Sequence, residues 1–160
     1  MAISSVIWFL CGNLLLELIM KILILHGPNL NLIGSISAQT SERVTLDKIN
    51  TALRRHIRSL EIELKITQTH KVFQAINFIQ RNRTWADGII IAPMAWAHYE
   101  YSILDAINIS KISAIQLLFS NGYGSIKKED SIFTDNCKST IVGSPNQIYI
   151  DGIDAFQKQS

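Results

Sequence analysis

The spacing of hydrophobic and polar residues changes along the chain in a way that predicts alternating strands and helices. Residues 21–25 and 88–92 are continuous apolar runs, as is typical of parallel strands buried on both faces. Residues 62–66 alternate between apolar and charged side chains, which indicates a half-exposed strand. Residues 114–118 and 140–143 complete the expected set of strands.

Between these strands, apolar residues recur at three- and four-residue intervals, which is the spacing of an amphipathic helix. Thr45 is the expected N-cap of the first helix, with Asp47 in its first turn. Gly152 weakens the helical prediction for the last segment. The expected helices cover residues 46–60, 71–83, 99–109 and 147–156.

Strands that alternate with helices favour a parallel sheet covered on both faces. We therefore expect an α/β fold, a flavodoxin-like doubly wound sheet of five parallel strands with helices on both faces. Ligands of such sheets bind outside the carboxyl ends of the strands. The segments after Leu25, Ala92 and Leu118 are therefore the first candidates for a binding site, and residues 26–44 are expected to be a loop.

Composition narrows the possible functions. With 160 residues, 48% of them hydrophobic, the chain can form one domain with a full core. The net charge of +2 is too small to imply a nucleic-acid partner. Cys11 and Cys137 form neither a disulfide framework nor a metal-ligand pattern. We expect no metal, no cofactor and a cytoplasmic location.

Residues 1–19 form an apolar extension ahead of the expected domain, residues 20–160. A membrane span needs about 20 mostly apolar residues, so this segment is of borderline length. No Lys or Arg precedes Lys21, which argues against a secretory signal. The sequence favours Met20 as the true start, because a buried first strand follows at once. An anchor or interaction segment is the main alternative, and a membrane association is not expected.

The segment after the first expected strand carries the most specific motif. From Gly27 to Gly34 it reads GPNLNLIG, which closely resembles the GPNLNLLG signature of type II 3-dehydroquinate dehydratases. The resemblance covers most of the chain from Met20 onward, and the chain is similar to a divergent member of that family. Further matches to the family's motifs are Pro93, His98, Asp105, Ala106, Ser120 and Asn121.

This resemblance implies an enzyme that removes water from 3-dehydroquinate to give 3-dehydroshikimate in the shikimate pathway. Such enzymes use no metal. A tyrosinate beside an arginine removes a proton, an asparagine orients a water on the enolate oxygen, and a histidine protonates the leaving hydroxyl. The family also implies a homo-oligomer, usually a dodecamer, and a small-molecule substrate.

Several of the implied catalytic positions are changed in this chain. The base position holds Ser41, the arginine position Ile36, and the acid position Leu118. Because a positioned acid or base contributes about 10²–10⁴ in rate, weak or absent activity is expected. Further altered positions are Gln116 for a glutamate, Ala92 for an asparagine and Glu129 near an expected arginine.

The remaining matches each have a functional and a structural interpretation. Asn29 would hold the enolate water, or would only shape its loop. The implied substrate-binding residues are His98, Ser120, Asp105 and Phe119. The first three have alternatives as a helix cap, an N-cap and a surface acid, respectively.

Two residues near these positions are possible substitutes for the missing base. Tyr123 and Arg43 would form a new tyrosine–arginine pair if their two loops converged. His26, at the end of the first strand, is expected to be structural. Three hypotheses remain open: a dehydratase of low activity, a non-catalytic homologue with a small-ligand pocket, and an assembly component.

Overall fold

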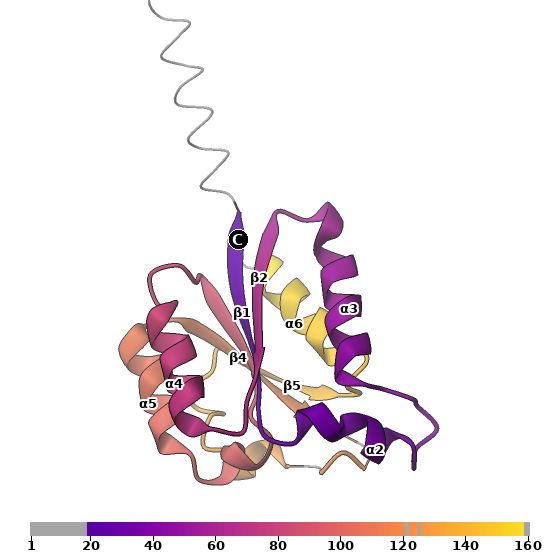
Figure 1. Cartoon of the computed structure of the whole chain (residues 1–160). Coiled ribbons are helices and arrows are strands. Elements are labelled where there is room, and N and C mark those ends of the chain that lie inside the picture. Colours follow the sequence, from indigo (N-terminus) through magenta and orange to yellow (C-terminus); the bar gives the residue numbers. More distant parts are fainter. Residues whose placement is uncertain (1–18, 121, 125, 159–160) are drawn as a thin grey trace, which may run out of the picture.

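The computed structural model describes residues 19–120, 122–124 and 126–158. Its strands form one sheet in the order β2-β1-β3-β4-β5, and every neighbouring pair is parallel (Figure 1). The prediction of five parallel strands is confirmed. The apolar extension lies outside the described residues apart from Ile19. The strands are β1 Met20–His26, β2 Ile62–Gln68, β3 Gly88–Ala92, β4 Ser113–Phe119 and β5 Ser139–Gly143.

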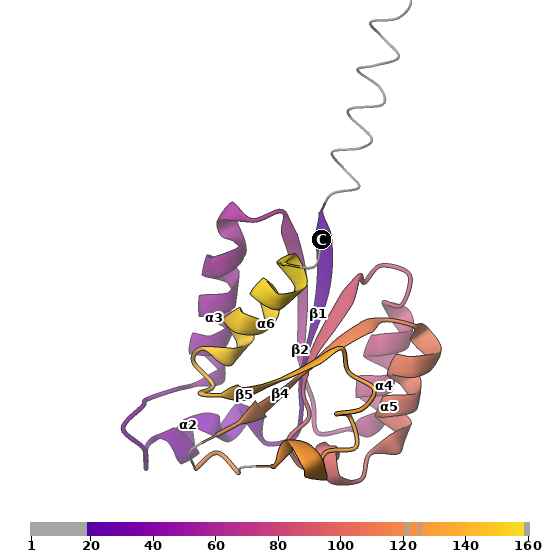
Figure 2. The same cartoon turned by 180° about the vertical axis from the view of Figure 1, so that it is seen from behind.

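Helices cover both faces of the sheet, as predicted. Helices α3 and α6 lie on one face, whereas α4 and α5 lie side by side on the other (Figures 1 and 2). Thr45 caps α3, because its side chain accepts a hydrogen bond from the Lys48 backbone N at 3.2 Å. No helix in the described part of the chain is both long enough and apolar enough to cross a membrane. The four helices that cover the sheet are α3 Leu46–His56, α4 Val72–Arg81, α5 Tyr101–Ser110 and α6 Ile148–Gln157.

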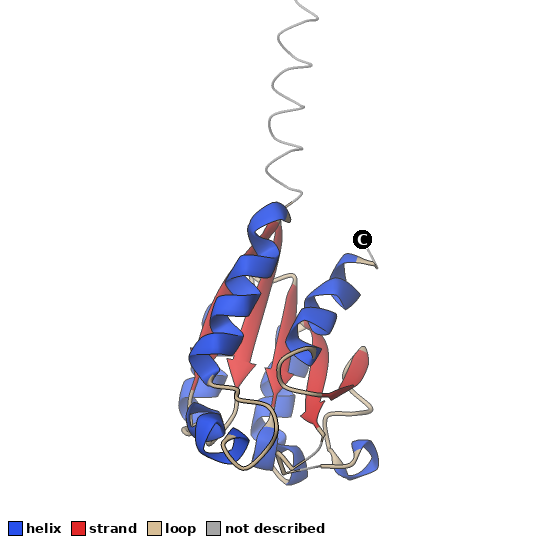
Figure 3. Ribbon diagram, turned by 90° about the vertical axis from the view of Figure 1, so that its right-hand side faces the viewer, coloured by secondary structure: helices blue, strands red, loops and turns tan. Residues whose placement is uncertain are grey.

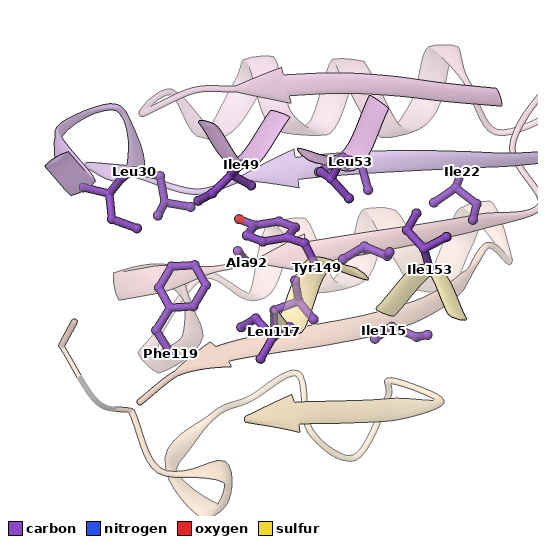
Figure 4. Close-up of a cluster of buried hydrophobic side chains, with 14 of the residues drawn as sticks. Ile22, Leu30, Ile49, Leu53, Ala92, Ile115, Leu117, Phe119, Tyr149 and Ile153 are labelled. Carbon is purple, nitrogen blue, oxygen red and sulfur yellow. The ribbon is translucent and has the colours of Figure 1, made fainter. Parts of the chain in front are cut away.

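Alternation along the buried strands divides the core between the two faces. Ile22 and Ile24 of β1 pack under α3 and α6, whereas Leu23 and Leu25 pack under α4 and α5. Tyr149 of α6 lies inside the first cluster (Figure 4). Helix α6 continues through Gly152 without a break. A Cβ added at this position would lie only 3.1 Å from the Ile90 Cδ1 of β3. The glycine lets this helix approach the sheet closely.

The prediction of a plain loop over residues 26–44 is wrong. This segment contains the 3-10 turn η1 Leu30–Leu32 and the short helix α2 Ile33–Ser37. The Ser37 hydroxyl donates to the Val44 carbonyl at 2.7 Å and accepts from the Val44 N at 3.0 Å. These two bonds hold the segment folded back on itself and satisfy both backbone groups of the buried Val44.

The segments that leave the strands gather at one edge of the sheet, below the arrowheads in Figure 3. They include α2 after β1, the 3-10 turn η3 Met94–His98 after β3, and the segment with η4 Lys128–Asp130 after β4. Tyr99 and Glu100 separate the end of η3 from the next helix, so α5 begins at Tyr101 rather than at Tyr99 as expected. The candidate site residues are therefore carried on several connected segments of one edge.

Candidate active site

The exit from β1 is fixed by close backbone packing against β3. The Gly27 N donates to the Ala92 carbonyl at 2.9 Å, and the Gln68 side chain donates to the Gly27 carbonyl at 3.2 Å. A Cβ on Gly27 would lie 2.6 Å from the Pro93 carbonyl oxygen. A glycine is therefore required here for steric reasons, and it directs Pro28 and the residue after it towards the sheet edge.

Asn29 adopts the left-handed conformation, with φ of 66°. Its backbone N donates to the Nδ1 of His70 at 3.2 Å. The contact fixes the turn that presents Asn29, and it makes Nδ1 the acceptor of the imidazole. No sequence motif pointed to His70, although its place two residues after β2, near the carboxyl end of a parallel strand, was a usable signal.

Asn29 and His98 line one hollow of about 470 Å³ at the carboxyl edge, within the usual range for small-molecule pockets. Asn29 comes from the β1 exit and His98 from η3, so two segments that are distant in sequence meet at this hollow, whereas Ser120 does not line it. Both side chains are exposed to solvent in the hollow. The complete lining is Pro28, Asn29, Ile36, Met94, Ala95, His98, Tyr123, Gly124 and Ile126.

A smaller cavity of about 120 Å³, here called the niche, lies against Tyr123, which also lines the larger hollow. Tyr123 is 3% exposed and lines both cavities, and its hydroxyl lies 3.2 Å from the Thr40 Oγ1. Its ring meets the Phe119 ring edge-on, with centroids 6.3 Å apart. The niche is lined by Thr40, Ser41, Glu42, Ser120, Tyr123 and Ser144.

The described contacts do not include the suggested pair between Tyr123 and Arg43. The two loops do converge, but the tyrosine meets Thr40 instead. Arg43 is exposed and lines neither the hollow nor the niche. The structure therefore gives Tyr123 a hydroxyl neighbour rather than a cationic one.

The positions that differ from the family's motifs have separate locations. The Ile36 side chain is half-buried and lines the hollow, Ser41 lines the niche, and Leu118 is buried within β4 at 2% exposure. An apolar side chain in the strand has no proton to transfer. Ala92 is fully buried at the end of β3.

Gln116 belongs to a closed polar network inside β4 rather than to the site. Its amide N donates to the hydroxyls of Thr134 at 3.1 Å and Thr140 at 3.0 Å. Its amide oxygen accepts from the Ser131 hydroxyl. Gln116 has no exposed surface, and this network satisfies its polar atoms without a charge.

Other predicted substrate contacts lie outside the hollow. Asp105 is exposed in the middle of α5 and does not line it. Phe119 is 3% exposed, and with Ser120 and Glu129 it borders a second hollow of about 570 Å³. Ser120 therefore joins the niche to this second hollow, while Asp105 is separate from all of these linings.

His26 is structural, in agreement with the prediction. It is fully buried, with Nδ1 2.7 Å from the Tyr149 hydroxyl and Nε2 3.0 Å from the Asn50 Oδ1. Since Asn50 Oδ1 can only accept, the neutral ring donates from Nε2 and accepts the tyrosine proton at Nδ1. Burial lowers the pKa of His26 from 6.5 to about 4, although the Asn50 bond acts in the opposite direction.

The described residues offer no cluster of three or more His, Cys, Asp or Glu side chains suited to a metal ion. Cys137 is a free thiol, and burial raises its pKa to about 12. It is therefore protonated at neutral pH. Cys11 lies outside the described residues.

The fold is a doubly wound α/β sheet with a largely apolar hollow at the carboxyl ends of its strands, which is where proteins of this class bind their ligands. Residues 20–157 match the family described as dehydroquinase class II. The chain belongs to this family, whose curated members are 3-dehydroquinate dehydratases.

Individual relatives agree with this assignment. The 3-dehydroquinate dehydratase of Caldanaerobacter subterraneus is 33% identical over 81% of this chain and 88% of its own length. That of Thermoanaerobacter pseudethanolicus is 32% identical over 86% and 93%. The type II dehydroquinase structure from Butyrivibrio crossotus superimposes with a TM-score of 0.76 at 29% identity, over 86% of this chain and 97% of that one.

Proposed function

We propose that this chain binds a small polyhydroxylated ligand related to 3-dehydroquinate, and that it dehydrates this ligand slowly or not at all. The observation that carries the proposal is the lining of the hollow. It keeps Asn29 and His98 from the family's motifs, while Ile36 occupies the position of the activating arginine. This combination favours binding over proton transfer.

The binding part rests on polar groups that converge at the sheet edge. The Asn29 amide can both donate and accept, and the His98 imidazole can do the same. The packing of Gly27 against β3 holds Asn29 in place before a ligand arrives. A preformed hollow with a few fixed polar groups is typical of small-molecule sites.

The proposal of slow or absent dehydration rests on which side chains at the implied catalytic positions can ionise. Ser41 carries an alcohol where the family carries a tyrosine, and it has no cation to promote its deprotonation among the niche residues. Leu118 cannot supply a proton to a leaving hydroxyl. Because base and acid act as a unit, their joint loss is expected to lower the rate by at least about 10³-fold. A non-catalytic homologue is the limiting case of this proposal.

A turnover assay on the full chain tests the proposal. Formation of the enone product from 3-dehydroquinate is followed by its ultraviolet absorbance, and ligand binding is followed by the thermal unfolding temperature. We expect a rise in unfolding temperature with little or no turnover. Asn29→Ala should remove the rise, whereas Asn31→Ala, an exposed change in the same loop, should not.

Two results would contradict this proposal. Rapid turnover would show that proton transfer proceeds without the missing groups. A ligand-independent unfolding temperature, with no turnover, would show that the hollow does not take this ligand class. The homo-oligomer implied by the family stays a prediction, which the solution mass of the purified chain would check.

A further inference from the structure

The niche beside Tyr123 has an unusual charge for a site related to a carboxylate-binding family. Its lining provides five hydroxyl groups and one carboxylate, that of Glu42. Among the described residues that line the niche and the adjoining hollow, there is no lysine or arginine. Glu42 therefore carries the one formal charge among the described residues that line the niche.

Contacts with the end of β5 hold Glu42 in this position. The Ser144 hydroxyl donates to Glu42 Oε2 at 2.6 Å, and the Asn146 amide N lies 3.4 Å from the same oxygen. Within the described residues, the other oxygen, Oε1, accepts no hydrogen bond. A fixed carboxylate with one free acceptor oxygen favours a ligand group that donates a hydrogen bond.

The backbone donor beside the niche is already used. The Ser120 N donates to the Gly143 carbonyl at 3.0 Å, which extends the pairing of β4 with β5. This N–H is therefore not available to an anionic ligand. Lys127 and Lys128 line the second hollow, which shares Ser120 with the niche, but neither lysine lines the niche itself.

We propose that the niche selects a hydrogen-bond-donating group of the ligand, a hydroxyl or an ammonium, and disfavours a carboxylate. This inference rests on the proposed function, because it assumes that a ligand occupies the adjoining hollow. A carboxylate placed here would be repelled by the like charge of Glu42, and no lysine or arginine among the described residues lines the niche to offset that repulsion. A hydroxyl or ammonium would instead donate to Oε1 and to the surrounding serine and threonine oxygens.

Binding of three non-reacting probes to the full chain tests this selectivity by titration calorimetry. Quinate carries a carboxylate, its methyl ester is uncharged, and its aminoethyl amide carries an ammonium. We expect the ester to bind about three- to tenfold more tightly than quinate, an effect limited by the solvent exposure of Glu42. Tighter binding of the amide than of the ester would identify an ammonium as the preferred group, and the reverse would indicate that a ring hydroxyl, which all three probes carry, donates in the niche.

The variant Glu42→Gln tests whether the charge of Glu42 causes the preference for the ester. It keeps an oxygen for Ser144 and removes the charge, so the preference for the ester over quinate should fall to near one. Glu129→Gln removes an exposed acid at the second hollow and should leave the preference unchanged. If Glu42→Gln fails to fold, the ratio measured on the unmodified chain still decides the question.

Equal or tighter binding of quinate than of the ester would overturn the inference while leaving the proposed function intact. A preference for the ester that survives in Glu42→Gln would also overturn it. A preference for quinate that disappears in Lys127→Gln would place the carboxylate in the second hollow, again contradicting the niche assignment. If none of the three probes binds, both this inference and the proposed ligand class are wrong.

Discussion

The chain leaves β1 and β4 at the same edge of the sheet, but the two exits differ in what holds them. At the β1 exit, backbone contacts of Gly27 with Ala92 and Pro93 fix the turn that presents Asn29. At the β4 exit, Leu118 is buried and the Ser120 N is paired with β5. The first exit keeps a polar group in the hollow, and the second closes into the sheet.

This difference separates two requirements of a family active site. Positioning a ligand depends on backbone geometry, and many side-chain changes elsewhere leave that geometry intact. Proton transfer depends on particular ionisable side chains at particular points, so single substitutions remove it. A chain can therefore keep the fold and the ligand hollow of its family while losing the groups that transfer protons.

Introducing the three groups that the family motifs imply is the strongest test of the contrast between the two exits. The variant Ile36→Arg, Ser41→Tyr and Leu118→His returns an arginine, a phenol and an imidazole to the positions that the family motifs assign to them. We expect dehydration of 3-dehydroquinate to increase by about 10²-fold or more over the unmodified chain. Initial rates of enone formation measure the change.

The single substitutions serve as controls for this variant. Because the groups act together, Ser41→Tyr alone should give little of the gain. The unfolding temperature of the triple variant must also be recorded, since Leu118→His places a polar ring in β4. A folded triple variant with unchanged turnover would show that the β4 exit differs from the family in more than these side chains.

At the β1 exit, the buried side chain of His26 is expected to make the free energy of unfolding depend on pH. Its pKa is about 4 in the folded chain and near 6.5 when exposed, so between these values the unfolded chain binds the extra proton. The stabilisation is complete above pH 6.5 and is lost as the pH falls towards 4, to a total of about 3 kcal/mol. Urea unfolding at pH 7.0 and at about pH 4.5 measures the loss.

Two variants isolate this contribution. His26→Gln removes the titrating group and should reduce the fall in unfolding free energy between the two pH values. Gln80→Ala changes an exposed residue of α4 that carries no titrating group, so it should leave the fall unchanged. An equal fall in both variants would assign the acid sensitivity to carboxylates elsewhere.

The two exits also differ in how far the sequence predicts them. Apolar runs such as residues 88–92 and the motif at Gly27 are local signals, so the strands and the β1 exit were predictable. The niche around Glu42 depends on α2 folding the chain back towards β5, a tertiary arrangement with no local pattern. Likewise, nothing in the spacing of Gln116 indicated that it would join a network with three hydroxyls from later segments.

The smallest effect that we predict concerns this network beneath the β4 exit. Gln116→Leu keeps a similar volume but removes the partner of the Thr140 hydroxyl and of the Ser131 proton. Buried groups without partners cost about 1–3 kcal/mol, so the unfolding free energy should fall by about 2 kcal/mol in urea titrations. Gln80→Leu, at an exposed position on α4, should change it by less than about 0.5 kcal/mol. If Gln116→Leu and Gln80→Leu had equal unfolding free energies, the hydrogen bonds of Gln116 would not stabilise the fold. The β4 exit would then be held by apolar packing alone.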